Sequence, residues 1–304
     1  MKALVISGGG SKGAFAGGVA QFLMQDNGRN YELFVGTSTG SLLLPHLALG
    51  KINKIRRIYT SIRQRDIFSS NPFTIKVNKQ GEKKVGINHF NVLKNFMKGA
   101  KTFGESYRLK TLIKRGFNQE EFEELKQSSK DIVVTVSNLS LNQIEYKSIK
   151  DFEYDDFCEW IWISGNFAPF MSLVEKDGYE YADGGFGVLV PIEEAINRGA
   201  TEIDVIVLKT EITEEIIESP KNAFSLTTDI HLFMADRIEK QNIRIGKFIA
   251  SQKKILLNFY YTPINLTNNS LIFDKELMSQ WWAQGYLFAK NKNKDTADLD
   301  NLNE

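Results

Sequence analysis

A serine stands between two glycines at the end of an apolar run, in the stretch FVGTSTGSLL of residues 34–43. Ser38 follows an expected strand and precedes an expected helix, with Gly36 before it and Gly40 after it. A serine at such a corner often caps the helix that follows. Several hydrolases use the same glycine-bounded turn to present a serine nucleophile. The corner therefore permits two roles for Ser38, a helix cap or a nucleophile, and other residues of the chain are needed to distinguish them.

A second glycine cluster, SGGGSKGAFAGG, directly follows the first apolar run of the chain. Backbone N–H groups of such a loop can bind an anion at a helix N-terminus, where the helix dipole also favours negative charge. The anion could be a dinucleotide pyrophosphate or the oxyanion of an acyl-transfer intermediate, for which one preorganised donor is worth about 3 kcal/mol. The candidate oxyanion loop comprises Gly8, Gly9, Gly10, Ser11, Lys12 and Gly13.

The dinucleotide alternative depends on the pattern G-x-G-x-x-G, which Gly8, Gly10 and Gly13 fit. It also requires an acidic residue about 20 positions further on, at the carboxyl end of the second strand. Glu32 stands at the start of that strand, and its end carries the Ser38 corner. In a parallel sheet the glycine loop and the Ser38 corner would face one crevice, which suits the oxyanion interpretation better.

Ser38 needs a base, because a serine hydroxyl is a weak nucleophile until its proton is removed. The chain has three histidines. His46 lies two turns into the helix after the serine, and His89 lies in a basic insert. His231 follows Asp183 along the chain, so the order Ser–Asp–His that some hydrolases use is available.

The other candidate base is Asp183 itself, in the stretch EYADGGFGVLVP, where Gly184 and Gly185 follow it. An Asp-Gly pair also favours a simple hairpin turn, and taken alone that explanation is sufficient. A carboxylate base near neutral pH would need a raised pKa, which a partly apolar pocket could provide. Tyr181, Phe167 and Phe186 are the candidate walls of such a pocket.

Three elements occur in order: G-G-G-x-K-G after the first strand, G-T-S-T-G after the second, and D-G-G well downstream. Together they resemble the patatin-like phospholipase family, whose members are acyl hydrolases with a Ser–Asp dyad. The resemblance extends over most of residues 1–210, and ISGNFAPFMSL is similar to the family's small-residue and proline segment. Lys12 stands where arginine is commoner in the family, and Ser41 stands where a second glycine is frequent.

This resemblance implies that Ser38 is the nucleophile, that Asp183 accepts its proton, and that residues 8–13 bind the oxyanion. It implies hydrolysis of a phospholipid or another acyl lipid, with no metal and no organic cofactor. A non-catalytic lipid-binding or signalling module on the same fold is the alternative. Such a module would be marked by a lost nucleophile or aspartate, and this chain keeps both.

The elements that must position these residues alternate along the chain. We expect strands near residues 3–7, 31–36, 131–139, 143–149, 203–209 and 254–261. We expect helices near residues 12–25, 39–50, 191–199, 224–250 and 274–291. Continuous apolar strands that alternate with helices predict an α/β fold, in which helices cover both faces of a mainly parallel sheet. With the family resemblance, the prediction is a three-layer α/β/α patatin-like fold.

Composition adds broad limits. The 304 residues are 42% apolar and 25% charged, with a formal net charge of +1, so no overall charge favours nucleic acid. Cys158 is the only cysteine, which excludes a disulfide within the chain, and its apolar surroundings favour a core position. No apolar run reaches the roughly 18 residues of a membrane span. We therefore expect a cytoplasmic protein, with peripheral membrane contact as an option.

A basic segment, residues 76–115, has eleven Lys or Arg residues against two acids, Glu82 and Glu105. One explanation is a solvated helical cap that the following acidic stretch QEEFEEL neutralises. The other is a basic lid that meets anionic lipid headgroups, at about 1 kcal/mol for each cation near the surface. We expect one catalytic domain of residues 1–290, with a variable helical insert at 50–130, and a polar tail of residues 291–304 without structure.

Overall fold

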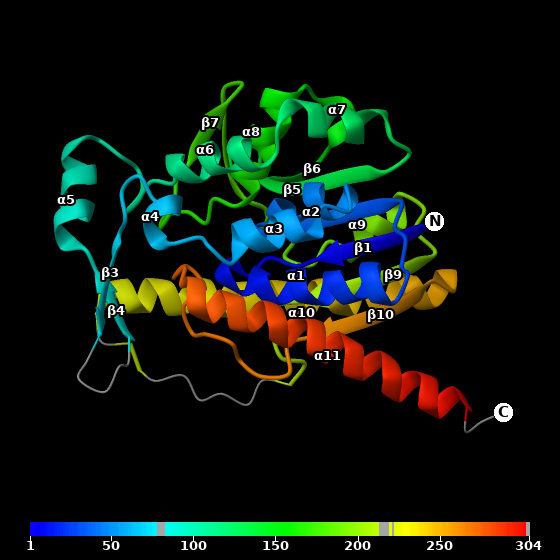
Figure 1. Ribbon diagram of the computed structural model, residues 1–304. Helices are drawn as coiled ribbons and strands as arrows, with labels where there is room; N and C mark the ends of the chain where they lie inside the picture. Colours follow the sequence, from blue (N-terminus) through cyan, green and yellow to red (C-terminus); the bar gives the residue numbers. More distant parts are fainter. Residues whose placement is uncertain (78–82, 213–218, 221, 302–304) are drawn as a thin grey trace.

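A mainly parallel sheet lies between two layers of helices in the computed structural model, which describes residues 1–77, 83–212, 219–220 and 222–301 (Figure 1). The strands of this sheet are β1 (Lys2–Ile6), β2 (Leu33–Thr37), β5 (Asp131–Asn138), β6 (Gln143–Ser148), β7 (Val174–Lys176), β8 (Tyr179–Asp183), β9 (Glu202–Val207) and β10 (Leu256–Tyr261). Their order is β10-β9-β1-β2-β5-β8-β7, with β6 also paired to β5. Strands β10, β9, β1, β2 and β5 are parallel, whereas β6 and β8 run antiparallel to β5. The predicted fold class is confirmed.

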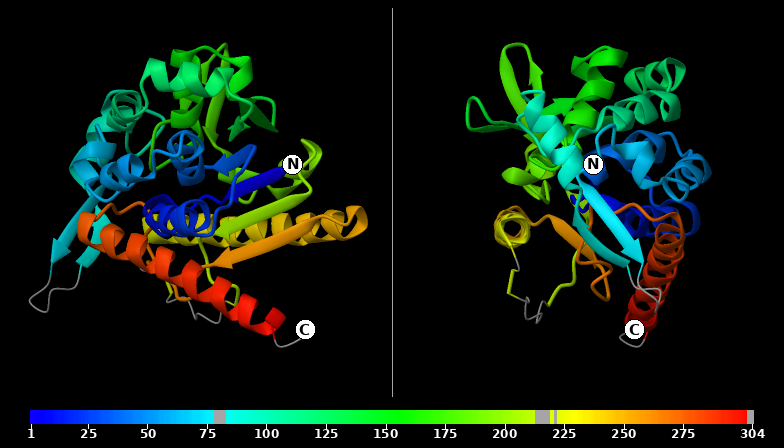
Figure 2. Two further views of the ribbon diagram at one scale, coloured as in Figure 1. Left: turned by 45° about the vertical axis from the view of Figure 1, so that its right-hand side comes forward. Right: turned by 90° about the vertical axis from the view of Figure 1, so that its left-hand side faces the viewer.

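The helices are α1 (Gly13–Gln21), α2 (Thr39–Ala48), α3 (Ile52–Tyr59), α4 (Gln64–Ile67), α5 (His89–Met97), α6 (Tyr107–Gly116), α7 (Gln119–Gln127), α8 (Tyr154–Ser164), α9 (Ile192–Asn197), α10 (Ala223–Lys253) and α11 (Lys275–Asn301). One buried cluster joins α1, α2, α8 and α11 to one face of the sheet. A second cluster joins α9 and α10 to the other face. Figure 2 (right) shows α10 and α11 on opposite sides of the sheet. The central strands are apolar throughout because both of their faces are covered.

Helices α1 and α11 approach closely at glycine positions. A Cβ atom on Gly18 would lie 2.0 Å from the carbonyl oxygen of Trp282, so only glycine fits there. Trp281 and Trp282 are both buried in this contact layer. Helix α11 therefore completes the core beside the helix that follows the glycine loop.

The insert of residues 50–130 contains α3 to α7, as expected, and also a two-stranded hairpin that the sequence analysis did not anticipate. The hairpin consists of β3 (Phe73–Val77) and β4 (Lys83–Ile87), and their antiparallel register pairs Phe73 with Ile87. The residues between the two strands lie outside the described part of the chain.

Lysines of the basic segment pair with acidic residues outside the stretch QEEFEEL, which was expected to neutralise them. Lys110 pairs with Glu159 of α8, Lys114 pairs with Asp155 of the same helix, and Lys101 pairs with Glu180 of β8. The acidic stretch QEEFEEL instead forms α7, and its Glu121 pairs with two lysines at the start of α3, Lys51 and Lys54. The predicted neutralisation by this stretch is therefore not observed among the described residues.

The division into a domain of residues 1–290 and a tail of 291–304 stays a prediction. Helix α11 runs on to Asn301, and residues 302–304 lie outside the described part. Among the described helices, none combines the length and the apolar character that crossing a bilayer requires.

Candidate active site

The pairing register of β5 brings Ser38 and Asp183 to one point of the sheet. Strand β2 pairs with β5 up to Thr37, which lies opposite Thr135. Strand β8 pairs with β5 from the next residue on, with Asp183 opposite Val136. Because β6 occupies the other edge of β5 over these residues, β2 and β8 share one edge and end against each other. Asp183 is thus the last residue of a strand, and Ser38 directly follows the last residue of another.

The backbone at Ser38 is strained. Its φ of 55° and ψ of −122° lie outside the regions that residues other than glycine prefer, at a cost on the order of 1–3 kcal/mol. The two glycines of the motif permit this turn by close approach. A Cβ on Gly40 would lie 2.3 Å from the carbonyl oxygen of Ile6, and one on Gly36 would lie 2.8 Å from the backbone of Gly40. Both glycines therefore keep the corner tightly packed against neighbouring backbone.

A buried serine that the sequence analysis did not single out holds this corner. The backbone N–H of Ser38 donates to Ser164 Oγ at 3.0 Å, and Ser164 Oγ donates to the carbonyl of Thr135 at 2.7 Å. Ser41 Oγ donates to the carbonyl of Gly36 at 2.9 Å and lies 2.8 Å from Ser164 Oγ. Ser41, one of the two residues at which this chain departs from the family pattern, thus belongs to the same network.

The same segment also holds the aspartate. Asp183 N–H donates to the carbonyl of Asn166 at 2.9 Å, and Ser137 Oγ donates to the carbonyl of Asp183 at 2.8 Å. Ser164 and Asn166 both belong to ISGNFAPFMSL, so one stretch of chain holds the backbone of both candidate catalytic residues. Only the family resemblance of that stretch indicated its role in advance. Spacing along the sequence does not reveal the contact between Ser38 and Ser164, because the two residues are more than a hundred positions apart.

The Asp183 carboxyl group is buried, with 2% of the residue exposed. Its Oδ1 accepts the N–H of Gly185 at 2.8 Å, and its Oδ2 has no hydrogen-bond partner within the described residues. Burial raises the pKa of Asp183 to about 7, while the nearby Ser38 hydroxyl and the Gly185 N–H act in the opposite direction. A Cβ on Gly184 would lie 2.4 Å from the carbonyl oxygen of Thr135, so the chain turns here against β5.

Two of the three aromatic residues expected near Asp183 form part of its apolar surroundings. Phe167 and Phe186 stack with ring centroids 5.2 Å apart, and Phe167 lines the same cavity as Asp183. The hydroxyl of Tyr181, by contrast, hydrogen-bonds with Asn138, and its ring contacts Trp160. The strand end therefore places Asp183 next to phenylalanine rings, while Tyr181 belongs to a separate cluster.

The glycine loop leaves two amides without a partner among the described residues. The N–H groups of Gly8 and Ser11 donate to the carbonyls of Leu189 and Ser270, whereas those of Gly9 and Gly10 donate to no protein group. Gly10 has a φ of +56°, and a Cβ there would lie 2.2 Å from the carbonyl oxygen of Ser270. The loop lies against the serine corner, since a Cβ on Gly8 would be 3.2 Å from Ser38 Cβ. Gly9 and Gly10 line the same cavity as Ser38.

The remaining residues of the predicted loop hold it against neighbouring segments of the chain. Lys12 Nζ donates to the carbonyl of Leu208, and burial lowers the pKa of Lys12 against the opposing charge of Glu239. Gly13 allows contact between the loop and the serine corner, because a Cβ there would lie 2.2 Å from Thr39 Oγ1. The N–H groups of Lys12 and Gly13 bond within the loop itself.

The histidines make no hydrogen bond with Ser38 or Asp183. His231 Nδ1 lies 2.7 Å from the carbonyl of Thr227 on α10, and its ring packs edge-on against Phe167 and Phe186. His89 is exposed at the start of α5. The predicted alternative of a Ser–Asp–His triad has no supporting contact in the described structure.

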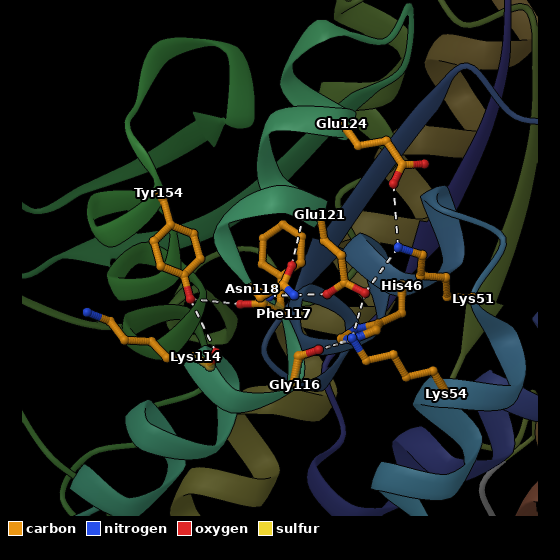
Figure 3. A network of polar contacts seen from close by, with 10 residues as sticks. All are labelled: His46, Lys51, Lys54, Lys114, Gly116, Phe117, Asn118, Glu121, Glu124 and Tyr154. Carbon is orange, nitrogen blue, oxygen red and sulfur yellow. Dashed lines mark hydrogen bonds and ion pairs between the residues drawn. The ribbon is translucent and has the colours of Figure 1, made fainter.

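His46 belongs to a separate polar network between α2 and the insert (Figure 3). Its Nε2 lies 2.8 Å from the carbonyl of Gly116, and burial lowers the pKa of its imidazole. Glu121 caps α7 with Asn118 and pairs with the lysines of α3, so this network fastens the insert to the helix that follows Ser38. Cys158 is buried, and burial raises the pKa of its thiol to about 12, as suits a core cysteine.

Glu32, the acidic residue considered for a ribose, lies at the far end of the strand from the glycine loop. Its side chain accepts the N–H of Lys2 at 3.0 Å, at the start of β1. The arrangement that dinucleotide binding requires is therefore missing at this position. The described residues contain no group of three or more histidine, cysteine or acidic side chains placed to hold a metal ion.

A cavity of about 900 Å³ opens over the candidate site. Its lining includes Ser38, Asp183 and the glycine loop. Apolar residues of the lining include Ile62, Ile67, Phe73, Phe170, Met171 and Leu271. Polar and charged residues of the lining include Lys12, Lys209, Asp236, Glu239, Lys240 and Asn268. The cavity thus offers both an apolar and a charged surface to one bound molecule.

Comparison with known proteins gives two findings. The family model described as patatin-like phospholipase matches residues 4–196 of the chain. The solved structure of VipD from Legionella pneumophila superposes with a TM-score of 0.51 at 14% identity, over 95% of this chain and 66% of the VipD chain. No curated protein sequence matches the chain significantly. The structural likeness concerns the fold alone, and the family match spans the serine corner and the aspartate turn.

We predict that Ser164→Ala lowers the free energy of unfolding by about 1–3 kcal/mol, because it leaves the half-buried N–H of Ser38 without its acceptor. Denaturant unfolding measures the change. Ser61→Ala is the matched control, since Ser61 is exposed and bonds only to a local carbonyl, and it should change stability by less than about 0.5 kcal/mol. If the two variants were equally stable, the role of Ser164 in holding the Ser38 corner would be contradicted.

Proposed function

The chain belongs to the patatin-like phospholipase family, and we propose that it hydrolyses a fatty-acyl ester through a Ser38–Asp183 dyad. The family supports lipid acyl hydrolase activity in general. The dyad, the oxyanion loop and a phospholipase A or lysophospholipase type of reaction are our finer proposal. The observation that carries it is the burial of Asp183 beside Ser38 with one carboxylate oxygen unpartnered, which suits a base with a pKa near neutrality.

In the proposed mechanism, Asp183 accepts the hydroxyl proton of Ser38 while the serine oxygen attacks the ester carbonyl carbon. The N–H groups of Gly9 and Gly10 bind the oxyanion of the tetrahedral intermediate. The intermediate collapses, the alcohol leaves with the proton from Asp183, and an acyl-enzyme ester remains on Ser38. Asp183 then takes a proton from water, which attacks the acyl-enzyme carbonyl. The second tetrahedral intermediate collapses, the fatty acid is released, and the departing Ser38 oxygen takes the proton back from Asp183.

The mixed lining of the cavity supports an amphipathic substrate. Its apolar residues, which include Ile62, Phe170 and Met171, suit an acyl chain, and its charged residues, which include Lys240 and Asp236, suit a polar headgroup. A second, apolar cavity shares the lining residue Leu42 with the first. A phospholipid or lysophospholipid has the combination of groups that this cavity offers.

The proposal extends to the insert and to the membrane. Residues 50–130 contribute Ile62, Ile67 and Phe73 to the cavity wall, which suits a cap that takes part in substrate choice. Within the insert, we propose the basic segment of residues 76–115 as the site of peripheral membrane contact. The one-domain division at residue 290 is part of the same proposal.

The alternative is a non-catalytic lipid-binding module with the same fold. The two interpretations predict different outcomes for an active-site probe. A fluorophosphonate should label Ser38 in a hydrolase, whereas a binding module should resist labelling. A dinucleotide-binding protein should also resist it, and should bind a nicotinamide or flavin cofactor instead.

We predict that Ser38→Ala and Asp183→Asn each reduce lipid hydrolysis by about a thousandfold or more, because either change removes the activated nucleophile. The measurement is mass spectrometry of fatty acids released from phospholipid and lysophospholipid. Ser61→Ala and Asp177→Asn are matched controls at exposed positions and should keep the wild-type rate. Turnover at the wild-type rate by either dyad variant would disprove the dyad.

We predict that kcat/KM rises with pH through about 7, because Asp183 must be deprotonated to act as the base and burial raises its pKa to about 7. A pH–rate profile on a soluble ester measures the midpoint. A profile already flat from about pH 5 upwards would contradict a base with the pKa of a buried carboxyl.

The same pKa predicts an opposite trend in stability. The unfolded chain loses the Asp183 proton near its ordinary pKa of 3.8, whereas the folded chain keeps it up to about 7, so stability decreases with rising pH in between. We therefore predict that the wild type loses about 2–4 kcal/mol relative to Asp183→Asn between about pH 4 and pH 8. Denaturant unfolding of both proteins at the two pH values tests this, and parallel pH dependence would refute it.

A further inference from the structure

Helix α5 is amphipathic, but its large apolar side chains face solvent and its polar side packs against the protein. The exposed fractions are 74% for Phe90, 60% for Leu93, 50% for Phe96 and 81% for Met97. Asn95, a polar residue of the same helix, is buried. Folded proteins rarely leave so many adjacent large apolar side chains in water, and such patches mark contact surfaces.

Hydrogen bonds fix this orientation of α5. Asn95 Nδ2 donates to the carbonyl of Phe103 at 3.0 Å, and its Oδ1 accepts from Ser70 Oγ at 3.0 Å. Asn91 Nδ2 donates to the carbonyl of Asn71 at 2.9 Å. The helix is therefore attached to the body by its asparagines, and its apolar face points outwards as a consequence.

The surroundings of this face are cationic. Helix α5 has no acidic residue, and its neighbours in the apolar patch, Lys94 and Lys98, are exposed and take part in no ion pair of the described residues. The adjacent hairpin adds the exposed Lys76 and an apolar cross-strand pair, Ile75 and Val85, both partly exposed. Of the lysines of the basic segment that have acidic partners, Lys110 and Lys114 pair with residues of α8, and Lys101 pairs with Glu180 of β8. The surface near α5 thus combines apolar side chains with unneutralised positive charge.

This surface lies next to the candidate active site. Ring contacts lead from Phe96 to Phe103 at 6.0 Å and from Phe103 to Phe170 at 5.7 Å, and Phe170 lines the cavity. Leu232 and Phe233 of α10 are exposed as well and also line the cavity. Figure 1 shows α5, the β3–β4 hairpin and the N-terminal end of α10 together at its left-hand edge.

We propose that the docking face, defined as Phe90, Leu93, Phe96 and Met97 with Lys94 and Lys98, binds an anionic lipid membrane. The apolar side chains enter the boundary between headgroups and acyl chains, and the lysines contact anionic headgroups. Docking in this way turns the cavity rim of Leu232 and Phe233 towards the bilayer. The inference rests on the proposed lipid hydrolysis, for which a membrane supplies the substrate.

The charge of the docking face argues against a second copy of the chain as its occupant. A two-fold contact would bring Lys94 and Lys98 against the same lysines of the other copy, without an acidic residue of α5 to offset them. A membrane with anionic lipids has the complementary charge and an apolar interior for the four large side chains. The membrane is therefore the occupant that both features favour.

The test measures vesicle binding in a Ser38→Ala background, which keeps the lipids intact. The vesicles contain phosphatidylcholine alone or with about 30% phosphatidylserine. Phe90→Asp with Met97→Asp should weaken binding at least about tenfold, because two apolar anchors are lost. Phe248→Asp is the matched control, since Phe248 is 67% exposed near the C-terminal end of α10, and this variant should bind normally. Lys94→Glu with Lys98→Glu should abolish the preference for phosphatidylserine.

Hydrolysis of a soluble short-chain ester separates this inference from the proposed function. In the active protein, the double aspartate variant should hydrolyse the soluble ester at the wild-type rate and vesicle lipids at least about tenfold more slowly. If wild type hydrolyses nothing but vesicle binding still depends on α5, the docking face is supported and the hydrolase proposal fails. Equal vesicle binding by all variants would overturn the docking face. A dimer that the aspartate substitutions dissociate, together with no vesicle binding by wild type, would overturn it as well.

Discussion

The candidate site depends on one feature of the sheet: two strands of opposite direction end against each other along the same edge of β5. Strand β2 ends at Thr37, opposite Thr135, and delivers Ser38 as the next residue, whereas β8 delivers Asp183 opposite Val136. Because the hydrogen-bond register of both strands is fixed by β5, the distance between the two side chains does not depend on a flexible loop. A one-residue slip of either strand would turn its alternating side chains to the other face. The buried apolar residues of both faces oppose such a slip, so the core of the protein also sets the geometry of the site.

Two costs are concentrated at this junction. Ser38 has a strained backbone conformation, and Asp183 is a buried carboxyl with an unpartnered oxygen. Either feature destabilises the fold, and the surroundings compensate through Ser164, Asn166 and the close packing at Gly40. Strain and burial of this kind persist where the environment fixes them, and they are commonest at functional sites. The segment that contains Ser164 and Asn166 is therefore as important for the arrangement as the two motifs that it holds.

Much of this architecture could be predicted from the sequence. The parts that could not be predicted depend on contacts between residues that are far apart along the chain. Strands such as β1 and β2 are short apolar runs that end in glycines, so local pattern and turn chemistry define them. The aspartate turn was ambiguous, because Asp-Gly also favours a hairpin and nothing near Asp183 shows that its strand ends against β2. The roles of Ser164 and Ser41 depend on contacts across long stretches of chain, which spacing does not reveal. The unpaired amides of Gly9 and Gly10 could be separated from the rest of the loop only once the partners of Gly8 and Ser11 were known.

The insert shows what composition leaves open. Residues 76–115 contain eleven basic residues, which suited either a solvated helical cap or a basic lid. In the folded chain, Lys101, Lys110 and Lys114 are already paired with acids, so they have less charge to offer a partner. The more unusual feature is α5, where the side chains of Asn91 and Asn95 anchor a helix whose phenylalanine, leucine and methionine side chains face water. A pattern of apolar residues at helical spacing predicts a buried face, and the sequence gives no sign that the polar side of α5 is the one that packs. A helix that only stabilised the fold would bury its apolar side chains, so the exposed apolar face of α5 suits the membrane contact that we propose.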